Sequence, residues 1–193
     1  PELLARNTFI NLLGLGLPLA AAVVAIPPIV DGLGPERFGI LGLIWVFAAW
    51  LALLDLGLGR ATTHFAAGAL ARGDRTGLRE VVGVAVASQL LIGVIGGAAG
   101  AALAGPVVRA FLELPPGVER EAVLSFTILA AGTPIVVVGN AFRGLLEADQ
   151  RFALVNAVRV PVSVANFLLP LGAVWAGWGL PVVVGGMVLA RLA

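Results

Sequence analysis

The sequence contains no cysteine, no lysine and no tyrosine, and only 12% of its residues carry a charge. Without cysteine, disulfides and thiolate metal sites are excluded. With so little charge, 60% hydrophobic residues and a mean hydropathy of +1.04, the chain lies far from the composition of a soluble domain. The net charge is only +1 and its arginines are scattered among acidic residues, so a nucleic-acid partner is not expected. No cofactor or metal site is predicted. The composition and long apolar runs predict an all-α integral membrane protein.

One stretch joins a membrane span to polar side chains. Residues 38–54 contain no polar side chain, and they extend roughly 26 Å as a helix, a little less than the thickness of a hydrocarbon core. Asp55, Arg60 and His64 follow, with Gly57 and Gly59 between them as places where a helix kinks or a neighbour approaches closely. Either this end of the helix faces a water-filled cavity, or Asp55 and Arg60 mark where the helix leaves the bilayer.

The chain divides into six apolar segments, which we predict to be six membrane spans of a single unit over residues 1–193. A tight turn is expected over residues 31–37, and Gly93, Gly97 and Gly100 predict close helix packing. Gln89 is expected to reach a partner helix or a lumen. The predicted spans are residues 7–30, 38–58 with a continuation as far as 71, 81–108, 123–146, 152–175 and 179–193, the last of them truncated.

Polar side chains recur at helical spacing on four of these segments. Exposing an asparagine or arginine to lipid costs a few kcal/mol, so such residues turn toward a partner or toward water. One polar face is explained by hydrogen bonds between helices, but four are more than packing needs. We therefore predict a hydrated, cationic cavity, in which Arg143 also has Glu147 as an i,i+4 partner. The candidate cavity residues are Asn7, Asn11, Arg60, His64, Asn140, Arg143, Asn156, Arg159 and Asn166.

The arginines predict the orientation of the chain. With a cytoplasmic amino terminus, Arg6, Arg72, Arg75, Arg79, Arg143 and Arg151 lie at inner ends, and Arg37, Arg109 and Arg120 lie at outer ends. The positive-inside rule favours this orientation, with the cavity opening toward the cytoplasm.

Three stretches carry a resemblance to a known family: GPERFGILGLIWVFAAWLALLDLGLGRATTHFA, RNTFINLLGLGLPLAAAVVAIPPIVDGLG and RGLLEADQRFALVNAVRVPVSVANFLLP. They resemble bacterial oligosaccharide flippases of the O-antigen translocase type, within the multidrug/oligosaccharidyl-lipid/polysaccharide (MOP) exporter superfamily. The resemblance implies a transporter of twelve or more helices in two six-helix lobes. This chain would be the amino-terminal lobe, and its partner, the carboxy-terminal lobe, would be missing.

The resemblance also implies a function in surface polysaccharide biosynthesis. The whole protein would move undecaprenyl-pyrophosphate-linked oligosaccharide across the bacterial inner membrane by alternating access, with the polyprenyl tail in membrane lipid. Arg60, His64, Arg143 and Arg159 would then contact the head group. Asp55 is the candidate for coupling to a proton or cation gradient, or else it pairs with Arg60 or another arginine and holds the lobe together.

Other classes of function fit less well. A multidrug or cation antiporter of the same superfamily would share the architecture but would favour carboxylates and aromatic residues in its cavity. An enzyme would need catalytic groups gathered in a sizeable loop, and the loops hold no nucleophile with its base and no metal-ligand cluster. A purely structural membrane protein would not need four polar faces.

Overall fold

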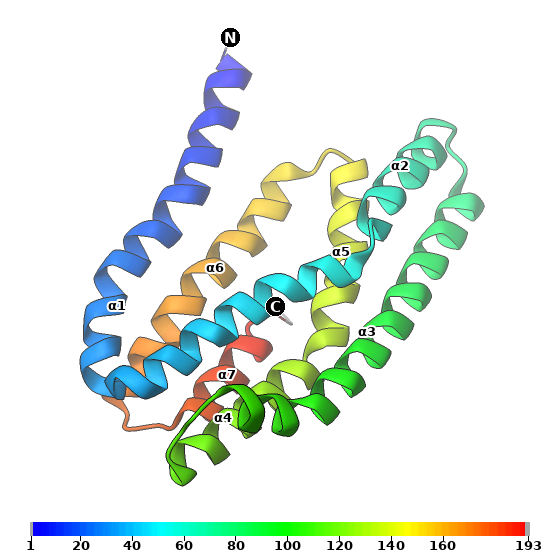
Figure 1. Ribbon diagram of the computed structural model, residues 1–193. Coiled ribbons are helices and arrows are strands. Elements are labelled where there is room, and N and C mark those ends of the chain that lie inside the picture. The colour runs from blue at the N-terminus through cyan, green and yellow to red at the C-terminus, as the bar shows by residue number, and fades with distance from the viewer. Residues whose placement is uncertain (1, 192–193) are drawn as a thin grey trace.

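In a bilayer the backbone must satisfy its own hydrogen bonds, so long apolar segments fold as helices. The computed structural model describes residues 2–191, with side chains from Gly16 onward except that of Ala52, and it is helical almost throughout this range (Figure 1). The elements are α1 (Glu2–Trp50), the 3-10 helix η1 (Leu51–Asp55), α2 (Leu58–Ala71), α3 (Arg75–Phe111), α4 (Pro116–Ala131), α5 (Thr133–Ala148), α6 (Phe152–Trp175) and α7 (Leu180–Leu189).

The longest helix, α1, is bent at one residue. Gly34 has φ 78° and ψ 163°, a conformation that is essentially reserved for glycine, and Pro35 follows at once. Figure 1 shows the chain turning sharply at this bend, with the two halves of α1 diverging from it and the second half crossing the face of the bundle. The tight turn expected over residues 31–37 is therefore replaced by helix on both sides of Gly34, because a single positive-φ glycine is enough to reverse the chain.

A second break follows the apolar stretch of α1. Its last turns tighten into η1, and Leu56 and Gly57 then adopt positive φ values of 48° and 83°. Gly57 is therefore the glycine at the predicted kink, whereas Gly59 lies inside the regular helix α2. The helix resumes to Ala71, as the sequence predicts for the continuation of this segment.

Small residues let α3 lie close to α4 and α5, as predicted from its glycines. A Cβ atom added at Gly93 would lie 2.6 Å from Cα of Pro134, and one added at Gly97 would lie 2.6 Å from the carbonyl oxygen of Ala130. Elsewhere the core consists of aliphatic side chains from α1, α4, α6 and α7. Its fully buried members include Ile29, Leu41, Ile44, Leu180 and Val184.

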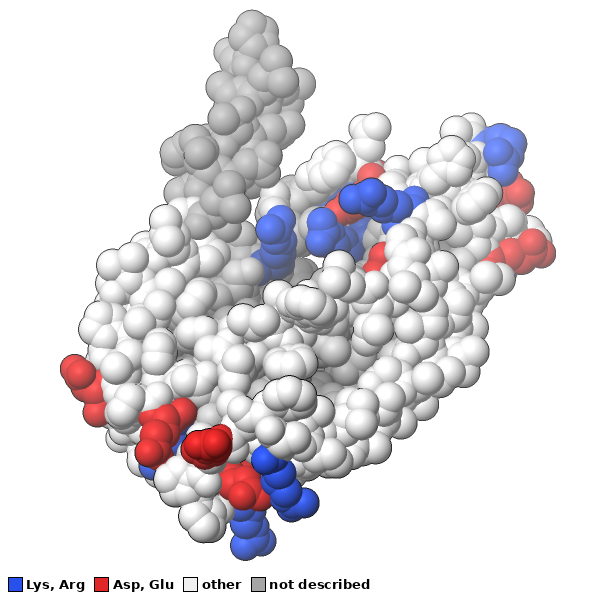
Figure 2. All heavy atoms as spheres, viewed as in Figure 1, with Lys and Arg blue, Asp and Glu red and all other residues white. Residues whose placement is uncertain are grey.

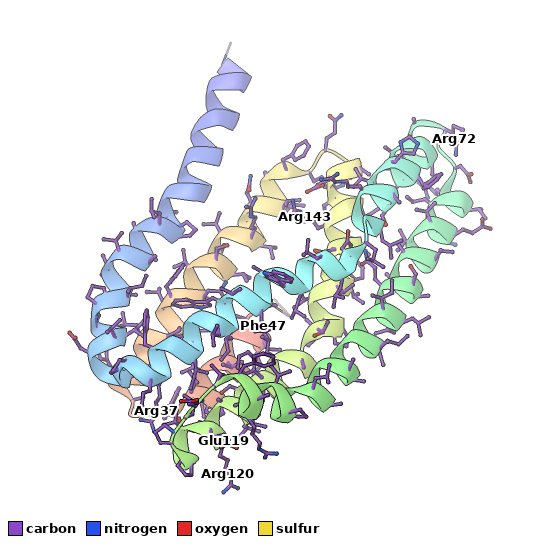
Figure 3. The ribbon with its side chains drawn as sticks, in the orientation of Figure 1. Arg37, Phe47, Arg72, Glu119, Arg120 and Arg143 are labelled. Atoms are coloured by element: carbon purple, nitrogen blue, oxygen red, sulfur yellow. The ribbon has the colours of Figure 1, made fainter. Side chains whose placement is uncertain are left out.

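Charge separates the bundle into two polar ends and an apolar middle. Figure 2 shows Arg, Asp and Glu side chains at both ends of the visible face, with a band free of them between. Figure 3 places Arg72 and Arg143 toward one end and Arg37, Glu119 and Arg120 at the other. Four helical stretches of the described chain are long and apolar enough to cross a membrane, namely Gly16–Asp55, Arg75–Phe111, Pro116–Ala148 and Phe152–Trp175, and Leu180–Leu189 is a shorter apolar helix. The count of six spans stays a prediction.

Candidate functional site: a polar cavity between η1, α2 and α5

Polar side chains from three elements line a cavity of about 270 Å³ near the end of the bundle where Arg143 lies. Figure 2 shows basic and acidic side chains around a hollow in this part of the molecule. We call it the polar cavity, and its lining residues are Asp55, Gly59, Arg60, Asn140, Arg143, Gly144 and Glu147. Four of the residues selected from the sequence, Asp55, Arg60, Asn140 and Arg143, therefore meet in one place.

Asp55 closes the start of helix α2. Its two carboxylate oxygens both accept the backbone N–H of Gly59, at 3.1 Å and 3.0 Å. This N–H belongs to the first turn of α2, where the backbone has no helical partner and the helix dipole favours a negative charge. The chain reversal at Leu56 and Gly57 brings the carboxylate to this position. Asp55 thus acts as a helix cap.

Gln89 of α3 holds Asp55 from a second side. Its side-chain nitrogen Nε2 donates a hydrogen bond of 2.9 Å to Oδ1 of Asp55. Gln89 is fully buried, and its other polar atom, Oε1, has no partner in the structure. Of the two possibilities left open for Gln89, the structure shows the contact with another helical element. No ion pair joins Asp55 to an arginine within the described residues.

The two arginines of the polar cavity differ in their contacts. Nε of Arg143 donates to Oε1 of Glu147 at 2.7 Å, which confirms the expected i,i+4 pair. The guanidinium nitrogens Nη1 and Nη2 of Arg143 have no hydrogen-bond partner among the described residues, and neither does any nitrogen of Arg60. Because a guanidinium binds phosphate oxygens through these N–H groups, both arginines are available to an anionic ligand.

Helices α2 and α5 touch directly at the floor of the polar cavity. A Cβ atom added at Gly144 would lie 2.7 Å from the carbonyl oxygen of Gly59 and 3.2 Å from Oγ1 of Thr63. Glycine at this position therefore sets the distance between Arg60 on one helix and Arg143 on the other. The one signal for Gly144 in the sequence is its place on the same helical face as Asn140 and Glu147.

Comparison with known proteins identifies the family. A family model described as MatE matches residues 29–171, which is well over half of the chain. The chain belongs to the MatE family. This result confirms the resemblance seen in the sequence and the predicted all-α membrane fold, because MatE proteins are multi-helix membrane transporters and the chain is a multi-pass membrane protein.

One curated relative is described as "Putative O-antigen transporter" and comes from Shigella flexneri. It is 24% identical to this chain over 188 residues, which cover 97% of this chain and 44% of the relative. The chain therefore spans less than half the length of that relative. No solved structure matches the chain significantly.

The structure places the remaining sequence candidates of this MatE chain outside the polar cavity. His64 is exposed on α2, with its ring 5.4 Å from that of Phe65. Asn156 and Asn166 of α6 are half-buried and Arg159 is exposed, and none of the three lines the polar cavity. Asn7 and Asn11 lie outside the residues whose side chains are described. The polar residues of α6 are thus not part of the lining of the polar cavity.

Besides Gly144, three residues of this MatE site were not among the candidates selected from the sequence. Glu147 was expected to pair with Arg143 from its i,i+4 spacing but was not selected as a cavity residue, and nothing in the spacing of Gln89 showed that it meets Asp55. Gly59 was noted only as part of a glycine pair. Its contribution is a backbone N–H that is approached closely by Asp55, because a Cβ atom added at Gly59 would lie 3.2 Å from Oδ2 of that carboxylate.

Proposed function

We propose that the whole protein translocates undecaprenyl-pyrophosphate-linked oligosaccharide across the bacterial inner membrane for surface polysaccharide biosynthesis. In this proposal the chain is the amino-terminal lobe, its amino terminus is cytoplasmic, and a carboxy-terminal lobe completes the transporter. The observation that carries the proposal is the polar cavity, in which the guanidinium groups of Arg60 and Arg143 are free to bind a pyrophosphate. The O-antigen transporter relative supports the same class of substrate.

An antiporter of multidrug or cation type is the second candidate, because the polar cavity also contains the carboxylates of Asp55 and Glu147. Both carboxylates already have partners within the chain. Asp55 accepts hydrogen bonds from Gly59 and Gln89, and Glu147 accepts one from Arg143. A cationic substrate would have to compete with these bonds, whereas an anionic one meets unpaired donors. The contacts therefore favour the lipid-linked anion.

The experiment compares head-group binding by arginine variants of the full-length protein. In Arg60→Gln and Arg143→Gln we expect the affinity for undecaprenyl pyrophosphate to fall roughly ten-fold each, because each variant loses charge-assisted hydrogen bonds. Binding is measured on purified protein in nanodiscs, and flipping of a fluorescent lipid-linked sugar is measured in proteoliposomes. Arg72→Gln, an exposed arginine outside the polar cavity, is the matched control and should bind as the parent does.

The proposal would be rejected if the protein did not bind undecaprenyl pyrophosphate, or if all three variants bound it with the same affinity. Efflux of a quaternary ammonium compound by the same proteoliposomes, unaffected by Arg60→Gln, would favour the antiporter instead. Arg159→Gln tests whether the face of α6 takes part: a loss comparable to that of Arg143→Gln would place Arg159 on the substrate path.

A further inference from the structure

A second and larger cavity lies along the bundle from the polar cavity. It encloses about 500 Å³ between the second half of α1, helices α3 and α4, and the first residue of α5. We call it the apolar groove, and its lining residues are Leu43, Phe47, Leu51, Gly96, Gly100, Leu103, Ala104, Val107, Val108, Phe111, Leu112, Phe126, Leu129, Ala130 and Thr133. Its size is that of a cavity that binds a small molecule or a hydrocarbon chain.

The lining of the apolar groove offers almost no polar contact. Thr133 contributes a polar side chain to the lining, but its hydroxyl oxygen is buried within the protein. Glycine lets α3 pack closely against α4 beside the groove, since a Cβ atom added at Gly100 would lie 3.1 Å from Cβ of Ala130. Phe47 packs edge-on against Phe126 with their ring centroids 5.3 Å apart. A ligand in the apolar groove must therefore be a hydrocarbon.

The apolar groove and the polar cavity are connected along three elements, namely α1, η1 and α5. Leu43, Phe47 and Leu51 line the apolar groove along α1 and at the start of η1, and Asp55 of the polar cavity is the last residue of η1. On α5, Thr133 of the apolar groove precedes Asn140 of the polar cavity by two helical turns, roughly 10 Å. Figure 3 shows the same order, with Phe47 nearer the α3–α4 end of the bundle than Arg143. The two cavities thus lie end to end.

The length and direction of the apolar groove match a membrane lipid. Along α3 it extends from Gly96 to Phe111, roughly 22 Å, which is most of a hydrocarbon core of about 30 Å. It begins near the polar cavity and runs away from it into the uncharged band of the bundle seen in Figure 2. A lipid whose anionic head binds Arg60 and Arg143 has its tail on this path.

We propose that the apolar groove binds the isoprenoid tail of the same lipid whose pyrophosphate head binds in the polar cavity. This inference rests on the proposed function for the identity of the lipid, and it adds that part of the tail leaves the bilayer and lies against the lobe. The lobe then recognises the substrate at both ends, by charge at the head and by hydrocarbon contact along the tail.

The test uses undecaprenyl pyrophosphate with a photoreactive diazirine in its tail, bound to the full-length protein in nanodiscs. We expect labelling at Leu103 and Val107, which line the apolar groove and are partly exposed. Unlabelled undecaprenyl pyrophosphate should abolish this labelling, whereas an equal amount of phosphatidylglycerol should not. In Leu103→Trp, which fills the groove, the labelling should be lost. The matched control is Ile95→Trp, an exposed apolar position of α3 outside the groove, which should retain it.

Each outcome separates this inference from the proposed function. If head-group binding persists but the diazirine labels no groove residue, the tail remains in the bilayer and the inference is wrong while the proposed function stands. Equal competition by phosphatidylglycerol would show a site for ordinary acyl chains. Groove residues that are covered by the rest of the full-length protein, and that are for this reason not labelled, would show that the groove is an interface within the protein. Either result overturns the inference. If undecaprenyl pyrophosphate does not bind at all, the proposed function fails first.

Discussion

Asp55 is bound on two sides by hydrogen-bond donors of the protein. A backbone N–H of α2 and the side-chain amide of Gln89 both donate to its carboxylate. These bonds stabilise the first turn of α2 and fasten it to α3, so the residue has a structural task whether or not it also couples transport to an ion gradient.

Two substitutions at Asp55 separate these tasks. Asp55→Ala removes the cap and should lower the free energy of unfolding by about 1–2 kcal/mol, whereas Asp55→Asn keeps an acceptor for the Gly59 N–H and should lose less. The measurement is the thermal midpoint of the full-length protein in detergent. Asp55→Asn also removes the negative charge, so transport that survives in this variant would exclude ion coupling at Asp55, and transport lost from a folded Asp55→Asn protein would support it.

For single residues, the sequence predicts contacts between side chains that are close together along the chain. Arg143 and Glu147 are one helical turn apart, and their pairing follows from that spacing alone. The hydrogen bond between Asp55 and Gln89 joins residues 34 positions apart on different elements, so helical spacing within either element could not predict it. Arg159 shows a different case: its polar face predicts a shared cavity, but Arg159 does not line the polar cavity between η1, α2 and α5, so its role stays a prediction.

Among the helices, the contact between α2 and α5 depends on one glycine. Gly144→Ala would place a methyl group 2.7 Å from the carbonyl oxygen of Gly59, so the two helices must separate. We expect a loss of about 1–3 kcal/mol in the free energy of unfolding, together with weaker head-group binding, because Arg60 and Arg143 move apart.

Gly139 is the matched control on the same helix. It has nothing within 4 Å of an added Cβ atom, so Gly139→Ala should stabilise α5 by up to about 1 kcal/mol through helix propensity. Thermal midpoints of the two variants should therefore change in opposite directions. Equal changes would show that Gly144 is not a contact point between α2 and α5.

The bend of α1 makes a similar prediction for its backbone. Gly34→Ala must hold a side chain at φ 78° and ψ 163°, which costs about 1–3 kcal/mol. Gly39→Ala, at a helical position with open space around it, should be neutral or stabilising. Thermal midpoints in detergent again provide the measurement. A Gly34→Ala protein as stable as the parent would mean that the bend tolerates a side chain and that glycine is not required there.

The existence of the helices was predictable from hydrophobicity, but their interruptions were only partly so. The break after the apolar stretch was expected from Gly57 and Gly59, and it occurs at Gly57. The connection over residues 31–37 was expected to be a tight turn. The structure needs only Gly34 to leave the helix, since neighbouring residues keep their backbone hydrogen bonds on either side.

For the whole molecule, the two charged ends define an orientation that can be measured directly. The chain has no cysteine, so Thr76→Cys near the α2–α3 turn and Glu113→Cys between α3 and α4 introduce single labels at exposed positions. With other cysteines of the full-length protein replaced, a membrane-impermeant thiol reagent should reach Glu113→Cys from outside intact cells and Thr76→Cys only after permeabilisation. The reverse pattern would place the amino terminus outside and the polar cavity on the outer face.

The bend at Gly34 also bears on how the protein enters the membrane during its synthesis. The bend carries Asp31, Glu36 and Arg37, and transferring such residues through the centre of a bilayer costs roughly 2.5–3.5 kcal/mol for each charge. With the proposed cytoplasmic amino terminus, this charged bend between the two halves of α1 crosses to the far side ahead of both. We expect the halves to insert together as a helical hairpin, whose combined apolar surface offsets the cost. The first half then waits at the translocon until the ribosome has completed the second.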